Sequence, residues 1–362
     1  MTMRVLHVDT GDEWRGGQRQ LFLLSRGLRD LGYEPLVVTS PAAPLAARLR
    51  DSGLAVSTTP MRASWDLTAI RHIRKLLRTW SPDVVHAHDA RAHALVLGAL
   101  EGDVATPLVI TRRTTAHPTP RGLELGHRIA RYVAVSRQVR AALIAGGIDP
   151  VLIDVVTPGI EAIEGVDGRD WRAAAGWPGE AIVSGVVGTL AQEPGFETLV
   201  RIVERLDPRA RDRTRLVLFT SEGPATLIAG VEAIRSAAAD HGRKGLAGLD
   251  LLWHSSATHG LGTVVLDAMS LGIPPVAFAT GPAADMIEHD VSGLLIGNGE
   301  EGAFAGAVSH LVLHDPARRN LAAGGPARAA LFDARNMIKA HDRVYRSLTP
   351  TYRDVNAQDR EG

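Results

Sequence analysis

Short apolar runs alternate with longer amphipathic stretches along most of the chain. The first apolar run, 4–9, is followed by a polar loop, 10–17, and by a stretch, 18–31, whose apolar residues recur with a helical period. The same order repeats through residue 156 and starts again at residue 182. Because a helix follows each strand, the strands should be parallel and covered by helices on both faces. The pattern predicts an α/β protein with two Rossmann-like, doubly wound domains.

The length of the chain agrees with two domains. Its 362 residues exceed one typical core, so we expect two domains of about 150 to 200 residues each. We place the N-terminal domain at residues 1–162 and the C-terminal domain at 163–332. A further helix is expected within 333–349, and the polar tail, 350–362, should be disordered. Within the second domain we expect a helix over 226–240.

Composition narrows the class of protein. The 40 basic and 40 acidic residues cancel, which argues against a nucleic-acid partner bound by a broad positive field. The chain has no cysteine, so it has no disulfides or thiolate metal sites, and it fits a reducing compartment. No run approaches the roughly 20 apolar residues of a membrane span, and residues 1–9 lack a signal-peptide core. We therefore expect a soluble, cytoplasmic protein.

Two loops of the first domain carry candidate binding residues. Gly16 and Gly17 lie between the first strand and helix, where doubly wound sheets bind ligands, although a tight turn would also use glycine. His88 ends the strand DVVHAH, and His86 should point the same way. Two histidines lack the third ligand that a metal site needs, so we expect no metal.

Arg112 and Arg113 end the strand that begins at Leu108. Two arginines at the carboxyl end of a parallel strand are well placed to clamp a phosphate or a carboxylate. The alternative is a pair of solvated surface charges, because arginine needs no partner at the surface.

The stretch from Trp253 to Thr280 reads as a loop, a helix and a short buried strand. Gly260 and Gly262 precede the helix, so backbone N–H groups at its start would be free to receive anionic oxygens. Asp267 lies about one helical turn further along, which would bring its carboxylate to the same side.

This stretch, WHSSATHGLGTVVLDAMSLGIPPVAFAT, resembles the signature of the retaining, nucleotide-sugar-dependent glycosyltransferases of family 4. The segments DVVHAH, TRR, TPGIE and GVVGTLAQEPGF resemble further motifs of that family. The resemblance implies a GT-B fold, in which two Rossmann-like domains flank a cleft and the final helix packs back on the first domain. It also implies transfer of a hexosyl-type group, with retention, to an envelope glycan or glycolipid, without a metal or another cofactor.

The resemblance also assigns roles to single residues. His259 stands where the family has a glutamate near the donor sugar, and it is the catalytic candidate together with His88. Asp267 stands where a second glutamate grips the ribose hydroxyls. The donor-binding candidates are Gly16, Gly17, Thr189, Gly260, Leu261, Gly262, Thr263 and Asp267, and the candidates for binding the acceptor or a phosphate are Arg15, Arg112 and Arg113.

The chain departs from the family pattern at two further places. Thr189 and Pro194 replace the Arg and Lys that neutralise the donor diphosphate. We also expect the strand and turn that hold the nucleotide base to be missing before Trp253, which would shorten the second sheet. An active transferase and an inactive pseudo-glycosyltransferase acting as a binding or partner subunit therefore both stay open. A dinucleotide-binding oxidoreductase is disfavoured, because W-R-G-G follows the first strand in place of G-x-G-x-x-G. A glycolipid acceptor would bring the protein to the inner face of the membrane.

Overall fold

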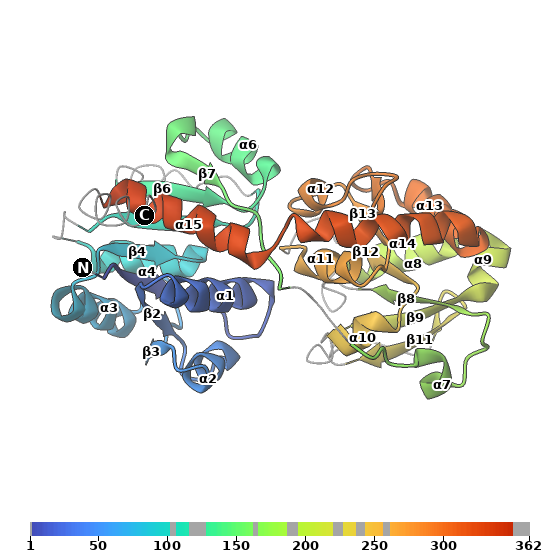
Figure 1. Cartoon of the computed structure of the whole chain (residues 1–362), viewed down its shortest axis with the longest axis horizontal. Helices are drawn as coiled ribbons and strands as arrows, with labels where there is room; N and C mark the ends of the chain where they lie inside the picture. Colours follow the sequence, from blue (N-terminus) through green and yellow to red (C-terminus); the bar gives the residue numbers. More distant parts are fainter. Residues whose placement is uncertain are drawn as a thin grey trace, which may run out of the picture. The chain divides into compact units, whose positions relative to one another are not determined.

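The computed structural model describes residues 2–101, 106–115, 128–161, 166–186, 195–219, 227–236, 243–255 and 261–349. The chain forms two compact units, Met1–Gly159 with Ala334–Gly362, and Ile160–Asp333. Each unit is built around its own sheet with helices beside it (Figure 1). None of the helices in the described part of the chain is long and apolar enough to cross a membrane.

The sheet of the first unit is parallel throughout and has the order β3-β2-β1-β4-β5-β6-β7. Its strands are β1 (Arg4–Val8), β2 (Glu34–Thr39), β3 (Ala55–Thr58), β4 (Val84–Ala87), β5 (Leu108–Arg112), β6 (Ile129–Ala134) and β7 (Ile153–Val155). The helices are α1 (Gly16–Asp30), α2 (Pro44–Asp51), α3 (Leu67–Trp80), α4 (Ala90–Ala99), α6 (Arg137–Ala145), the 3₁₀ turn η2 (Pro150–Leu152) and α15 (Ala334–Leu348). The order reverses between β1 and β4, and ligands of doubly wound sheets bind at such a point.

Local sequence explains where several of these helices begin. Asp66, Asp89 and Ser136 precede α3, α4 and α6, and each side chain accepts a hydrogen bond from an N–H group of the first turn. The predicted alternation of strand and helix is thus confirmed in the first unit.

The second unit has the sheet order β10-β11-β9-β8-β12-β13-β14. Its strands are β8 (Ile182–Val186), β9 (Thr214–Phe219), β10 (Leu227–Ile228), β11 (Val231–Ser236), β12 (Leu251–His254), β13 (Pro275–Phe278) and β14 (Leu294–Ile296). The helices are α7 (Trp171–Ala175), α8 (Gly195–Glu204), α9 (Pro208–Arg213), α10 (Arg243–Ala247), α11 (Thr263–Ser270), α12 (Ala283–Met286), α13 (Glu301–Leu313) and α14 (Asp315–Ala330). Phe304 of α13 packs its ring on Phe278 and Trp253, with ring centroids 5.1 and 6.3 Å apart.

The helix expected over 226–240 is wrong. Residues 227–236 form an antiparallel hairpin of β10 and β11, and β11 pairs with β9. Ala229 and Gly230 have φ of 46° and 86°, as a two-residue hairpin turn with positive φ requires. The apolar residues of this segment fit a helical period as well as a strand period, and the turn at Ala229 and Gly230 selects the hairpin over the helix. Among the described residues the second sheet has seven strands, so the expected shortening is wrong as well.

The last helix, α15, contacts α1 of the first unit. The hydroxyl of its buried Tyr345 lies 2.6 Å from Nδ1 of His86 on β4, and the Tyr33 hydroxyl donates a hydrogen bond to Asp342. These two polar contacts fix a helix that is more than 250 residues away from β4 in sequence. The position of α15 therefore depends on buried side chains of the first sheet.

Four buried histidines surround this contact. His7 on β1 lies directly opposite His86 on β4, and Nδ1 of His7 is 3.0 Å from Nε2 of His88. Nε2 of His86 is 2.8 Å from the Thr111 hydroxyl, and the ring of His341 from α15 lies 5.7 Å from that of His86. Burial lowers the pKa of all four, that of His7 to about 3 and that of His341 to about 4. The cluster is therefore neutral at pH 7.

Tyr345→Phe should destabilise the first unit, because it leaves Nδ1 of the buried His86 without its partner. We expect a loss of about 1 to 3 kcal/mol in the free energy of unfolding, measured by urea denaturation. Ser347→Ala on the same helix is the control, because its hydroxyl bonds only to a carbonyl of its own helix, and it should change stability by less than about 0.5 kcal/mol. Equal effects of both variants would contradict this assignment.

Acidification should also destabilise the first unit. The histidines have their ordinary pKa of 6.5 in the unfolded chain, so below that pH the unfolded state binds protons that the folded state excludes. Stability should be full above pH 6.5 and fall below it, by at most about 1.4 kcal/mol per pH unit for each histidine. Urea denaturation at several pH values measures this loss. A flat profile down to about pH 5 would refute the prediction.

Candidate functional site

The candidate site of the first unit lies at the carboxyl ends of β1, β4 and β5. Asp9 follows β1, His88 and Asp89 follow β4, and Arg113 follows β5. Gly17 belongs to the first turn of α1, which starts after the loop that leaves β1. The five residues come from three neighbouring connections and meet at one edge of one sheet.

Asp9 is the buried anion of this edge. Its Oδ1 accepts hydrogen bonds from the backbone N–H of Gly11 at 3.0 Å and from Nε2 of Gln18 at 2.8 Å. Its Oδ2 lies 3.5 Å from Nη2 of Arg113. Burial raises the pKa of Asp9, and the guanidinium of Arg113 opposes that shift. Sequence reasoning missed Asp9, although an acidic residue directly after the first strand of a doubly wound sheet was a usable signal.

The guanidinium of Arg113 lies against Gly17. A Cβ atom at Gly17 would come within 2.3 Å of Nη1 of Arg113, so only glycine leaves room for this position of the arginine. The Arg113 side chain is 20% exposed. Two of the predicted binding residues, far apart in sequence, are thus brought together at the N-terminus of α1, where the helix dipole also favours anions.

The other two predicted cations of the first unit are not part of this arrangement. The side chain of Arg15 is mostly exposed and pairs with Glu13 at 2.7 Å. Arg112 is a residue of β5, and it acts electrostatically on Tyr132 and His93 instead of Asp9. Neighbouring residues along an extended chain point to opposite sides, so Arg112 and Arg113 do not form a joint clamp.

Asp89 and His88 fix the loop after β4. Asp89 accepts hydrogen bonds from the backbone N–H and the hydroxyl of Thr10, both at 2.7 Å, and from the backbone N–H of Ala92 at 2.8 Å. His88 is held by its contact with His7, and burial lowers its pKa well below the ordinary value. The loops after β1 and β4 are therefore joined by charge-assisted hydrogen bonds, and the candidate catalytic imidazole is neutral.

His7 adds a third imidazole to the pair that the sequence suggested. One nitrogen of each of His7, His86 and His88 lies within 4.8 Å of the others, which is a possible ligand set for a metal ion. The bond between His7 and His88 occupies two of these nitrogens, however, and Tyr345 and Thr111 occupy both nitrogens of His86. A metal ion would have to replace some of these bonds. The arrangement observed joins two strands to α15, and the absence of a metal stays a prediction.

The second unit places its predicted residues around the start of α11. Gly262 caps the helix with φ of 62°, a left-handed conformation that favours glycine. Leu261, Thr263 and Asp267 are buried, and Asp267 lies one turn into the helix, as expected. The candidates Thr189, His259 and Gly260, and the substitution Pro194, lie outside the described residues.

Known families match both units. The model of Glycosyltransferase Family 4 matches residues 14–162, and that of Glycosyl transferases group 1 matches residues 181–314. A 2-deoxystreptamine N-acetyl-D-glucosaminyltransferase of Streptomyces fradiae is 27% identical over 90% of this chain and 89% of its own. A GDP-mannose-dependent alpha-mannosyltransferase of Mycobacterium tuberculosis is 30% identical over 82% of this chain and 84% of its own. A D-inositol 3-phosphate glycosyltransferase of a Nocardioides strain is 27% identical over 75% of this chain and 69% of its own.

Solved structures agree on the fold. The crystal structure of Anabaena HepE in complex with UDP-glucose has a TM-score of 0.80 to this chain and 20% sequence identity. The match covers 95% of this chain and 100% of HepE. With two doubly wound units, two matching family models and relatives that match most of its length, the chain belongs to the GT-B glycosyltransferases of family 4 and group 1.

Proposed function

We propose that this chain transfers a hexosyl group, with retention, from a nucleotide sugar to an envelope glycan or glycolipid that carries an anionic group. The observation that carries the proposal is the guanidinium of Arg113, held over Gly17 beside the buried Asp9. The arrangement lies where doubly wound sheets bind ligands.

The contacts of Arg113 suit a site for an incoming anion. Its Nη2 lies 3.5 Å both from Asp9 Oδ2 and from the carbonyl oxygen of Gly17, longer than a strong hydrogen bond of about 2.7 to 3.2 Å. A guanidinium has five donors, and a phosphate or carboxylate can take two of them in parallel. Asp9 thus orients Arg113 without saturating it. The relative from Nocardioides is named for an acceptor that carries a phosphate, which supports an anionic acceptor here.

The start of α11 supports a donor site in the second unit. Gly262 leaves the first backbone N–H groups of the helix available for diphosphate oxygens, and the carboxylate of Asp267 suits hydrogen bonds to ribose hydroxyls. One relative is named for its dependence on GDP-mannose, and HepE is seen with UDP-glucose. We therefore propose a nucleoside diphosphate sugar as donor, bound without a metal.

His88 and His259 are the proposed contacts near the reacting sugar. Because burial keeps His88 neutral, we assign it a hydrogen bond to a sugar hydroxyl and no role as a cation at pH 7. The replacement of two family cations by Thr189 and Pro194 favours one other function, an inactive subunit that binds a partner. The two functions differ in whether the protein turns over a donor.

The donor site can be tested with a panel of nucleoside diphosphates and their sugars, titrated calorimetrically. One nucleotide should bind saturably and raise the melting temperature as its concentration increases. Asp267→Asn should weaken that binding by about 10-fold to 100-fold, since each charge-assisted bond contributes about 1.5 to 3 kcal/mol. Glu204→Gln, at an exposed position of α8, should bind as wild type does. No binding at millimolar ligand, together with no turnover, would favour the inactive subunit.

The acceptor site can be tested with two variants, one that displaces the Arg113 side chain and one that removes it. Gly17→Ala should displace the flexible guanidinium, and Arg113→Gln should remove its charge; the melting temperature of each variant shows that it is folded under the assay conditions. Both variants should lower kcat/KM for an anionic acceptor by about 10-fold to 100-fold, with donor binding unchanged. The rate of nucleoside diphosphate release measures this effect. Gly306→Ala is the matched control, because a Cβ there meets nothing within 4 Å. Full activity of both Gly17 and Arg113 variants would refute the anion site.

A further inference from the structure

One ring nitrogen of the histidine cluster lacks a partner. Nδ1 of His7 lies 3.0 Å from Nε2 of His88, whereas Nε2 of His7 is buried without a hydrogen bond in the described part of the chain. His88 differs, because its Nδ1 is not among the buried side-chain atoms of the described residues that lack a partner. The two imidazoles thus share one bond, and their remaining nitrogens have different surroundings.

Each of these two rings carries a single proton. Burial lowers the pKa of His7 to about 3 and the pKa of His88 well below its ordinary value, so both rings are neutral at pH 7. A neutral imidazole has one N–H group, which donates, and one lone pair, which accepts. The bond of 3.0 Å therefore needs an N–H group on one ring and a lone pair on the other. This condition allows only two arrangements of the two protons.

The buried Nε2 of His7 decides between the two arrangements. If His88 donates to Nδ1 of His7, the proton of His7 must be on Nε2, where no described residue accepts it. If Nδ1 of His7 donates, its Nε2 has only a lone pair, and the proton of His88 must be on Nδ1. Buried N–H groups without an acceptor are rarer in proteins than buried acceptors without a donor. The arrangement in which His7 donates is therefore the more stable one.

The N–H group that this arrangement gives to His88 is at the ligand edge of the first sheet. His88 directly follows β4, and the positive charge of Arg113 acts on its ring and opposes a second proton. A guanidinium has donors and no acceptor, and the lone pair of His88 is occupied by the bond from His7. Both side chains therefore offer N–H donors, which suit an oxygen atom that carries negative charge.

We infer that His7 is a positioning residue, which holds the proton of His88 on Nδ1 and so makes His88 a hydrogen-bond donor to an oxygen of the bound ligand. A general base needs a free lone pair, so this arrangement excludes that role for His88. The inference deepens the proposed function and rests on it for the identity of the ligand. The position of the proton on the free protein does not depend on turnover.

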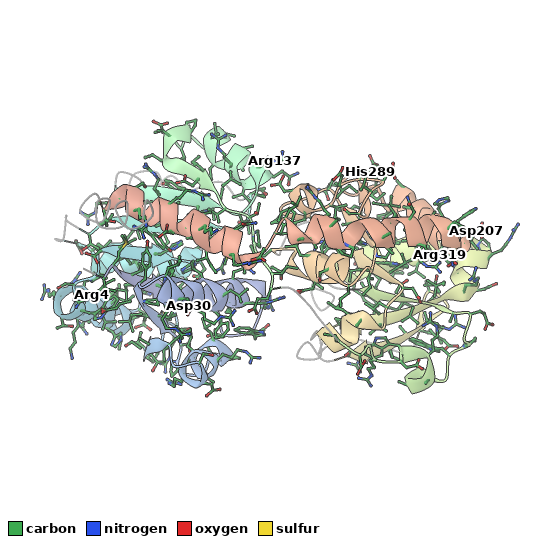
Figure 2. The ribbon with its side chains drawn as sticks, viewed as in Figure 1. Arg4, Asp30, Arg137, Asp207, His289 and Arg319 are labelled. Carbon is green, nitrogen blue, oxygen red and sulfur yellow. The ribbon has the colours of Figure 1, made fainter. Side chains whose placement is uncertain are left out.

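Two other histidines of the chain provide internal references for the position of a proton. Nδ1 of His341 lies 2.9 Å from the carbonyl oxygen of Met337, which only accepts, so the proton of His341 is on Nδ1. Nδ1 of His289 accepts a hydrogen bond from the backbone N–H of Leu295 at 3.0 Å, so a neutral His289 carries its proton on Nε2. His289 lies in the second unit, away from the histidine cluster in sequence (Figure 2).

NMR of the full chain with isotope-labelled histidine can locate the proton. Long-range correlations between ring protons and ring nitrogens, recorded at about pH 8, distinguish a neutral ring protonated on Nδ1 from one protonated on Nε2. Both His7 and His88 should give the pattern of His341. Signals lost in the variants His7→Asn and His88→Gln assign the two rings. The pattern of His289 on either ring would overturn the inference.

Inorganic phosphate can test whether this N–H group faces the ligand. Millimolar phosphate should shift the Nδ1 resonance of His88, and Arg113→Gln should weaken the apparent affinity by about 10-fold or more. The proton of His88 should stay on Nδ1 in that variant. Arg319→Gln, on α14 in the second unit, removes the same charge and should respond as wild type does (Figure 2). An unchanged His88 resonance, or equal effects of both arginine variants, would contradict a ligand contact.

Two substitutions of His7 separate positioning from packing. The carboxylate of His7→Asp only accepts, so Nε2 of His88 should take the proton, as the aspartate of a Ser-His-Asp triad fixes its histidine. The amide of His7→Asn can still donate and should preserve the tautomer of wild type. In the transfer assay, His7→Asp should lower kcat/KM by about 10-fold or more, and His7→Asn by less than about threefold. Melting temperatures show that both variants are folded, and equal losses of activity would indicate a purely structural role.

Failure of this inference can be distinguished from failure of the proposed function. The NMR measurements need neither a donor nor turnover, so they locate the proton of His88 even in an inactive protein. An active enzyme whose His88 carries its proton on Nε2 would refute the inference and leave the transfer reaction intact.

Discussion

The parallel pairing of β1 with β4 is the constraint on which the first unit depends. It sets His7 opposite His86, and it brings the loops after the two strands together, where Asp89 binds Thr10. The order of the sheet reverses at this pair, so the chain leaves the two strands in different directions and an open edge results. A change in this register would turn side chains to the other face and would separate the histidines from α15.

Burial divides the polar residues of this edge into two kinds. The histidines are neutral, and their hydrogen bonds to one another and to hydroxyl groups, together with the bond of His341 to the carbonyl oxygen of Met337, hold β1, β4 and α15 together. Among the described residues, Nε2 of the buried His7 has no hydrogen-bond partner. Asp9 and Arg113 form a looser pair, in which one member is buried and the other reaches solvent. In this loose pair the long Nη2–Oδ2 distance leaves donors of the Arg113 guanidinium without an ideal partner.

The second unit shows how glycine sets local geometry on a similar sheet. Gly262 turns the chain into α11 in a left-handed conformation, and Gly230 completes the turn between β10 and β11. Gly262 thus sets where α11 starts, and Gly230 allows the antiparallel strand β10 to pair at the margin of the sheet. Both depend on backbone conformations that a side chain would strain.

The sequence by itself determined the alternation of strands and helices, the parallel pairing of most strands, and the glycines and Arg113 at the strand ends, because these follow from periodicity and turn chemistry within short windows. It did not distinguish a hairpin from a helix at 227–236, where the apolar spacing fits both periods and the turn at Ala229 and Gly230 decides. Only the tertiary structure brought His7 to His86, Asp9 to Arg113 and Tyr345 to β4, and it separated Arg112 from Arg113. The physical reason is that strand pairing and helix docking join residues far apart in the chain, and no local pattern records which of them will meet.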